Sequence, residues 1–213
     1  MVGVIGGTGH QGLGLAMRWA AADIPVVIGS RSLDRAQAAA ARVRKTVGGG
    51  RVEGMENPAA ARASEVIVIT VPPEAQVEIL SAIAPEVAGK IVVDATVVLG
   101  SPPSYAVQLP EGSAAERAQR ILGAGTRVVA AFHTVPAALL ADLTRPVDCD
   151  VLVCGDETAA KVRVIELAGA FGARAVDVGA LRQAHTLERI TALLIGLGRR
   201  VRRHDLGVRI TGL

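Results

Sequence analysis

The sequence predicts an α/β fold in which helices cover both faces of a doubly wound parallel sheet. Short runs rich in Val and Ile alternate along the chain with longer, Ala-rich stretches of helical periodicity. Most of these runs are apolar throughout, which is typical of strands buried on both faces. Strands that alternate with helices form parallel sheets, because each helix carries the chain back to the start of the next strand.

The elements follow from this alternation. The expected strands are Val2–Ile5, Pro25–Gly29, Val52–Gly54, Val66–Val71, Ile91–Asp94, Val128–Phe132, Val151–Cys154 and Ala173–Asp177. The expected helices between them are Gly12–Ala22, Leu33–Thr46, Glu74–Ala84, Ala114–Gly123 and Glu157–Gly169.

Two segments depart from the alternation. Gly100–Gly112 is rich in Pro, Ser and Gly, which predicts a long loop. Ala184–His204 predicts one further helix with two unlike faces. The apolar face holds Leu187, Ile190, Leu193, Leu194, Leu197 and Val201, and the opposite face holds Arg199, Arg200, Arg202 and Arg203.

Composition limits the classes of function. Half of the 213 residues are apolar but only 2% are aromatic, so there are too few rings to stack nucleic-acid bases. The net charge of +3 is small, and most surplus arginine lies near the C-terminus, which favours a local anion site. No apolar run is long enough to span a bilayer, and none resembles a secretory signal. We expect a cytoplasmic protein, with Cys149 and Cys154 reduced and buried and no metal site.

A glycine-rich segment follows the first expected strand. Gly7-Thr8-Gly9-His10-Gln11-Gly12 is a G-x-G-x-x-G sequence that leads from an apolar run into a helical pattern. In this context glycine permits the tight turn and lets the backbone approach a pyrophosphate, and the helix N-terminus supplies free N–H groups. The competing hypothesis is an ordinary strand-to-helix turn. We expect a Rossmann-type dinucleotide-binding domain over residues 1–180 and a small C-terminal helical segment over residues 181–213.

The end of the second expected strand indicates which dinucleotide is bound. A protein that binds NAD has Asp or Glu here to bond the ribose hydroxyls. This chain has Gly29-Ser30-Arg31, with Arg35 one helical turn further on. A hydroxyl and two guanidiniums suit the 2′-phosphate of NADP(H), although Ser30 or Ser32 is also placed to cap the next helix. The sequence therefore predicts NADP(H).

Val71-Pro72-Pro73 follows the fourth expected strand. Proline at this end stops the strand and turns the chain over the crevice in which α/β sheets bind ligands. These residues either only end the strand or also contact the cofactor.

Five segments together resemble a known family. They are Gly6-Gly7-Thr8-Gly9, Gly29-Ser30-Arg31, the Phe-His-Thr-Val-Pro-Ala-Ala run from Phe132 to Ala138, Val153-Cys154-Gly155-Asp156, and Leu206-Gly207. In order and spacing they are similar to those of the NADPH-dependent reductases of coenzyme F420, and the likeness covers nearly the whole chain. The glycine loop is shared with many enzymes, whereas the run after Phe132 is much more specific.

The resemblance implies reversible hydride transfer between NADP(H) and F420, a 5-deazaflavin, in a cleft between the Rossmann domain and the C-terminal part. The phosphate contacts that it implies are Thr8, Gly9, His10, Gln11, Ser30, Arg31 and Arg35. The contacts that it implies for the nicotinamide half are Pro72, Pro73 and Val77. The deazaflavin contacts that it implies are Leu99, His133, Ala137 and Leu206.

Some positions depart from the family pattern or have two interpretations. Pro73 stands where some relatives have an aromatic residue, and Gly100–Gly112 matches poorly, so the F420 tail site is the least defined part. His133 is either a structural histidine or a ligand contact. The arginines at Arg199–Arg203 either form a solvated surface or attract the anionic tail of the deazaflavin.

No catalytic side chain is expected, because the two cofactors carry the redox chemistry and the protein needs only to align their rings and exclude water. Backbone N–H groups near Ala137 and Leu206 would stabilise charge that develops on the deazaflavin. Two other functions remain open. One is an NADP-dependent imine or keto reductase, whose substrate domain is commonly much longer, and the other is a non-catalytic NADP(H)-binding sensor. The expected partners are these small molecules and a second copy of the chain in a homodimer.

Overall fold

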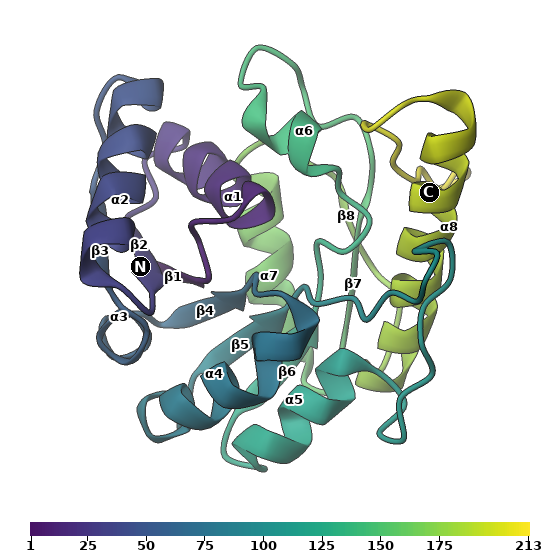
Figure 1. Ribbon diagram of the computed structural model, residues 1–213, viewed down its shortest axis with the longest axis horizontal. Coiled ribbons are helices and arrows are strands. Elements are labelled where there is room, and N and C mark those ends of the chain that lie inside the picture. Colours follow the sequence, from purple (N-terminus) through teal and green to yellow (C-terminus); the bar gives the residue numbers. More distant parts are fainter.

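The computed structural model describes all 213 residues and is built around one eight-stranded sheet (Figure 1). The strands are β1 (Val2–Ile5), β2 (Val26–Ser30), β3 (Val52–Glu56), β4 (Val66–Ile69), β5 (Ile91–Asp94), β6 (Arg127–Ala130), β7 (Val151–Gly155) and β8 (Ala175–Asp177). The helices are α1 (His10–Ala21), α2 (Leu33–Val47), α3 (Asn57–Ala63), α4 (Gln76–Ile83), α5 (Ala114–Leu122), α6 (Ala137–Ala141), α7 (Thr158–Gly169) and α8 (Ala184–Val201). Short 3-10 turns precede α4, follow α4 and precede α8 (Pro73–Ala75, Ala84–Glu86 and Leu181–Gln183).

The strand order is β3-β2-β1-β4-β5-β6-β7-β8, and the strands from β3 to β6 are all parallel. The chain builds outward from β1 to β3 and then returns to the centre to start β4. Because the connections leave β1 and β4 in opposite directions, a crevice opens beyond the carboxyl ends of these two strands. The predicted doubly wound, Rossmann-type α/β fold is confirmed.

The expectation of a fully parallel sheet is wrong at β7. This strand pairs antiparallel with β6, through Val129 with Gly155 and Ala130 with Cys154, and β8 then pairs parallel with β7. A parallel crossover needs a helix that carries the chain back along the sheet. The β6–β7 connection contains only the short helix α6, so the chain enters β7 from the end at which it left β6.

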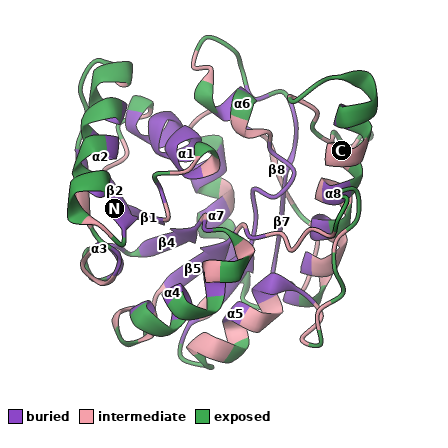
Figure 2. Cartoon of the chain, viewed as in Figure 1, coloured by how far each residue is buried: buried purple, intermediate pink, exposed green.

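Helices cover both faces of the sheet, and the central strands between them are buried, whereas β3 and β8 at the two edges are partly exposed (Figure 2). Alternate residues of each central strand enter two separate cores: Val2 and Val4 pack beneath α1, α2 and α7, whereas Ile5 packs beneath α3, α4 and α5. Burial on both faces is the physical reason for the apolar runs that predicted the strands. Three of the few aromatic rings, Trp19, Phe132 and Phe171, meet in the first core, and the Trp19–Phe132 centroids lie 5.7 Å apart.

The predicted boundaries of β1 and β5 match the structure, and those of the other predicted elements, apart from the last helix, differ by at most two residues at either end. Two helices were not predicted, α3 and α6, and the predicted helix from residue 184 to 204 ends at Val201. Arg202 follows it in the left-handed conformation, with φ of 55°. Residues 95–113 contain no helix or named strand, in agreement with the predicted loop.

The C-terminal part, residues 181–213, contains a 3-10 turn, α8 and a closing irregular segment. Its first half joins the second core through Leu181, Ala184 and Leu187. Cys149 and Cys154 are both buried and free, as predicted. None of the helices has the length and apolar character required to cross a membrane.

Gly54 in β3 provides a test of the packing between α2 and the sheet. A Cβ atom at this position would lie 2.3 Å from the carbonyl carbon of Ala36, which is backbone and cannot rotate away. We expect Gly54→Ala to lower the free energy of unfolding by about 1–3 kcal/mol. Gly169→Ala, where a Cβ meets nothing within 4 Å, is the control and should be neutral or slightly stabilising. Equal denaturation midpoints for the two variants would contradict this packing.

Candidate functional site

The turn between β1 and α1 has the geometry of a phosphate-binding loop. Gly6 adopts φ of 72°, which favours glycine, and Gly9 N–H donates to the Gly6 carbonyl at 3.2 Å. A Cβ at Gly12 would lie 2.6 Å from the Gly7 Cα, so the loop and the helix pack at the closest possible approach. No side chain caps the N-terminus of α1, and its first N–H groups are therefore available to an anion.

A cavity of about 410 Å³ opens at this loop and extends over the ends of β2 and β4. Eight of the predicted contact residues line it: Thr8, Gly9, His10, Gln11, Ser30, Arg31, Arg35 and Pro72. Pro73 and Val77 do not line this cavity, and the Val77 side chain is largely exposed on α4. The lining also includes Asn57, Thr70 and Ile79, which the sequence did not indicate.

The arginines at the end of β2 are free to bind an anion. The Ser30 hydroxyl accepts from the Ser32 N–H at 3.3 Å, and the Ser32 hydroxyl accepts from the Arg35 N–H at 3.4 Å, so Ser32 caps α2. The capping interpretation is thus correct for Ser32. The guanidiniums of Arg31 and Arg35 are exposed and make no hydrogen bond or ion pair within the protein. Their forked donors match the oxygens of a phosphate monoester.

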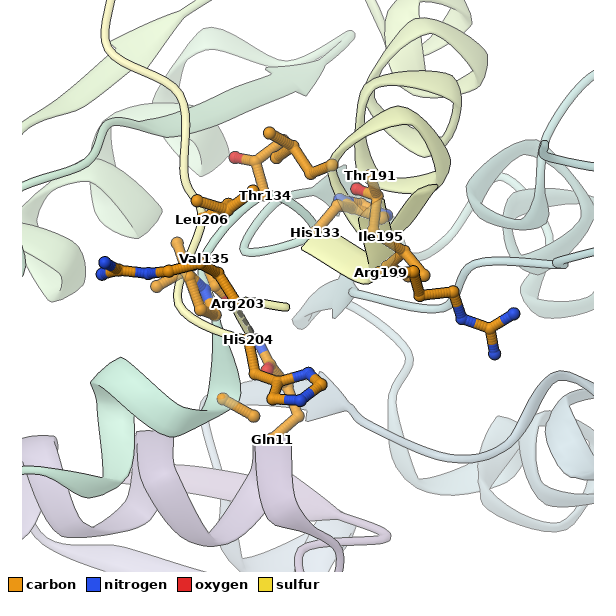
Figure 3. A pocket seen from close by; sticks show the side chains of 13 residues that line it. Gln11, His133, Thr134, Val135, Thr191, Ile195, Arg199, Arg203, His204 and Leu206 are labelled. Atoms are coloured by element: carbon orange, nitrogen blue, oxygen red, sulfur yellow. Dashed lines mark hydrogen bonds between the residues drawn. The ribbon is translucent and has the colours of Figure 1, made fainter. Parts of the chain in front are cut away.

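A second cavity, of about 420 Å³, lies between the segment after β6 and the C-terminal part (Figure 3). Figure 3 shows its lining side chains converging from α8, from the start of α1 and from the segment around Val135. Of the predicted contacts it includes Gln11, His133, Ala137 and Leu206. Leu99 lies outside it and pairs instead with Ala106 in an isolated bridge.

Gln11 belongs to both cavities and joins them. Its side-chain amide donates to the carbonyls of Phe132, at 3.1 Å, and Val135, at 3.3 Å. Phe132 has φ of 68°, which is unusual for a bulky residue, and this left-handed turn lets the chain leave β6 towards α1. The two cavities therefore meet where α1 begins.

The wall of the second cavity contains polar atoms without partners. Both ring nitrogens of His133, which lines the cavity, are buried and make no hydrogen bond within the protein; the buried hydroxyl of Thr96, outside the lining, has no partner either. Burial lowers the pKa of His133 to about 4, because the imidazolium would lose its hydration, so the ring is neutral at pH 7. Buried polar atoms without partners are rare in folded proteins. They fit a ligand that has a polar edge as well as an apolar body.

One face of α8 contributes to this wall, a role that the sequence indicated only for the arginines of the helix. Thr191, Leu194, Ile195 and Arg199 recur at helical spacing and line the cavity, together with Arg203 and His204. On the other side of the helix the apolar side chains of Leu193, Leu197 and Val201 are exposed. The spacing of Thr191 and Ile195 was visible in the sequence, but only the position of Leu206 opposite α8 reveals that this face lines a cavity.

A glycine turn at a helix N-terminus, free arginines at the next strand end and an adjoining cavity define a Rossmann-type dinucleotide-binding protein. The model of the family described as "NADP oxidoreductase coenzyme F420-dependent" matches residues 1–98. The chain is 46% identical to the F420-dependent NADP reductase of Methanothermobacter thermautotrophicus, over 100% of this chain and 95% of that protein. It is 39% identical to the F420-dependent NADP reductase of Methanocaldococcus jannaschii, over 100% of this chain and 98% of that protein. The chain belongs to this family of F420-dependent NADP reductases.

A solved structure shares the whole architecture. A crystal structure of a protein from Arthrobacter sp. FB24 superimposes with a TM-score of 0.84 at 26% sequence identity. The match covers 99% of this chain and 98% of that one, so the C-terminal part is included.

A substitution at Gly9 tests whether the glycine turn contacts the pyrophosphate. A Cβ at Gly9 would come no closer than 3.7 Å to another atom, so a larger side chain is tolerated by the fold but projects into the first cavity. We expect Gly9→Val to keep the melting temperature of the free protein while NADP no longer raises it. Gly125→Val, in open space outside both cavities, is the control. If NADP stabilised Gly9→Val as much as the wild-type protein, the loop would not contact the pyrophosphate.

Proposed function

We propose that this protein is an oxidoreductase that transfers a hydride reversibly between NADP(H) and coenzyme F420. The observation that carries the proposal is the pair of cavities joined at Gln11. The first is lined by groups suited to phosphate, and the second by apolar side chains together with the unpartnered ring nitrogens of His133. Full-length identity to F420-dependent NADP reductases supports it.

Each cavity has a distinct task in this proposal. In the first, the N–H groups at the start of α1 bind the pyrophosphate, and Ser30, Arg31 and Arg35 bind the 2′-phosphate. Pro72, Pro73 and Val77 border the nicotinamide half. In the second, the proposed contacts of the deazaflavin are His133, Ala137, Leu206 and, from the adjacent loop, Leu99.

The chain's own contribution to the reaction is alignment and exclusion of water. When bound, the nicotinamide and the deazaflavin supply the redox chemistry, hydride passing between C4 of the first and C5 of the second. Gln11 fixes the segment after β6 against the glycine loop, so that the residues that would hold the two rings keep a fixed relative position. Val135, Leu194 and Ile195 line the second cavity and displace water from the reacting atoms. No side chain acts as a nucleophile.

The oligomeric state and the cellular location stay predictions. A homodimer is favoured by the exposed apolar side chains of Leu193, Leu197 and Val201, which repeat every fourth residue along α8. The second prediction is location in the cytoplasm. Neither changes the chemistry proposed for the two cavities.

Arg31 should determine the preference for NADP(H). In Arg31→Ala the charge-assisted bonds to the 2′-phosphate are lost, which corresponds to about 1.5–3 kcal/mol. We expect the Kd for NADPH to rise at least tenfold, while the weaker binding of NADH changes less than twofold. Fluorescence titration with each nucleotide measures both constants. Equal losses for NADPH and NADH would mean that Arg31 has a structural role.

The acceptor is tested by mixing the protein with F420 and NADPH, with NADH in parallel. Reduction removes the visible absorbance of the deazaflavin, so we expect the band to bleach rapidly with NADPH and slowly with NADH. An imine or keto reductase would oxidise NADPH with a small carbonyl or imine substrate but leave the band unchanged. A sensor would bind NADPH and oxidise it with neither acceptor. Failure of the intact protein to bleach F420 would end the proposal.

A further inference from the structure

The last residues of the chain form one wall of the second cavity although they contain no regular element. After Val201 the chain turns back through Arg202, and the Arg203 N–H donates to the Gly198 carbonyl at 2.8 Å. Leu206 then enters the cavity wall opposite α8 (Figure 3). An irregular segment has no hydrogen-bonded ladder of its own, so other residues must fix where Leu206 lies.

Asp150 and Arg174 form an ion pair beneath this segment. The Arg174 guanidinium donates to both carboxylate oxygens of Asp150, Nε to Oδ1 at 2.8 Å and Nη2 to Oδ2 at 2.6 Å. Asp150 is only 1% exposed, and Arg174 holds the pKa of its carboxyl below the ordinary value. A paired carboxylate with two bonds to one guanidinium has a fixed orientation.

The same two residues bind the backbone of the C-terminal segment. The Asp150 N–H donates to the Val208 carbonyl at 2.7 Å, and the Ile210 N–H donates to Oδ2 of Asp150 at 2.6 Å. Arg174 donates to the carbonyls of Ile210 and Leu213. The segment from 208 to 213 is therefore attached to the start of β7 and the residue before β8 at several points.

Asp150 also binds the neighbouring part of this wall, the segment that follows β6. Its carbonyl accepts from the Thr134 hydroxyl at 3.3 Å, and Thr134 lies between His133 and Val135 in the lining of the cavity. Next to it, Gly207 packs so closely on Cys149 that a Cβ would lie 2.4 Å from the Cys149 Cβ. The residues around Asp150 thus hold both Thr134 and Leu206, which lie next to each other opposite α8, although neither Asp150 nor Arg174 lines the cavity.

We propose that Asp150 and Arg174 are positioning residues, which fix the Thr134 and Leu206 side of the cavity relative to α8 and thereby set the affinity for the acceptor. The inference rests on the proposed function, since it takes the occupant of the second cavity to be the deazaflavin. The ion pair acts through backbone bonds to residues 208–213 and through Thr134. It has no contact with the first cavity, so it should leave NADPH binding unchanged.

Arg174→Gln tests the proposal, and Arg62→Gln is the matched control. Arg62, on α3, also donates two hydrogen bonds to one carboxylate, from Nε to Oε2 of Glu86 at 2.8 Å and from Nη2 to Oε1 at 2.7 Å. It lines neither of the two cavities. With the intact chain we expect Arg174→Gln to raise the KM for F420 at least fivefold, with kcat and the Kd for NADPH changing less than twofold. This pattern indicates loss of acceptor binding rather than of the chemical step. Arg62→Gln should change none of the three constants.

Attachment of the segment is measured separately by limited digestion with trypsin. Arg209 is exposed, and cleavage after it releases the last four residues, which mass spectrometry detects. We expect release to be at least tenfold faster from Arg174→Gln than from the wild-type protein or Arg62→Gln. If Arg174→Gln does not fold, Arg174→Lys retains the charge on a single donor nitrogen, without the forked geometry, and should give intermediate values for KM and for cleavage.

The outcomes separate this proposal from the proposed function. An unchanged KM for F420 in both Arg174 variants, or a parallel rise in the Kd for NADPH, would overturn the positioning role. Faster cleavage with an unchanged KM would show that the ion pair only anchors the segment, and this also overturns the proposal. A wild-type protein that binds NADPH but never bleaches F420 refutes the proposed function itself, whatever the cleavage rates.

Discussion

The geometry of the site depends on the hydrogen bonds from the Gln11 amide to the carbonyls of Phe132 and Val135. Gln11 is the second residue of α1, so its position follows from the glycine turn that also offers N–H groups to phosphate. Phe132 and Val135 lie on either side of His133 in the chain. One side chain therefore fixes the second cavity relative to the first. Helix α1 thus provides a common reference for both cavities.

Arg18, also on α1, stabilises the segment between β6 and β7. The guanidinium of Arg18 is only 7% exposed and donates to the carbonyls of Leu139, Leu140, Asp142 and Arg145. Burial lowers its pKa, and Asp142 opposes that effect. Leu139 and Leu140 belong to α6, which has only five residues and would not be stable alone. A cation at its C-terminal end satisfies carbonyls that the helix leaves free.

The sequence was informative where local rules decide the structure and uninformative where tertiary contacts decide it. Apolar runs predicted β1 and β5 to the residue, because burial on both faces leaves a pattern in the strand itself. The reversed direction of β7 leaves no such pattern, since it depends on how a connection without a long helix crosses the end of the sheet. The helix α6 was missed for a similar reason, since the residues that stabilise it lie in α1. For α3, however, Pro58 at the helix start followed by alanines was a usable signal.

The second cavity is better suited to an acceptor whose charge spreads over a ring than to a simple carbonyl. Hydride addition to a ketone yields an alkoxide, which needs a proton from a nearby acid. No Asp, Glu, Tyr or Lys lines the cavity, and His133 is neutral because burial lowers its pKa to about 4. His204 is exposed at the surface and is the other histidine in the lining. An extended heteroaromatic acceptor distributes the added charge towards its polar edge, where hydrogen-bond donors stabilise it without a proton-transfer step. The unpartnered ring nitrogens of His133 in the cavity lining are suited to a polar edge of this kind.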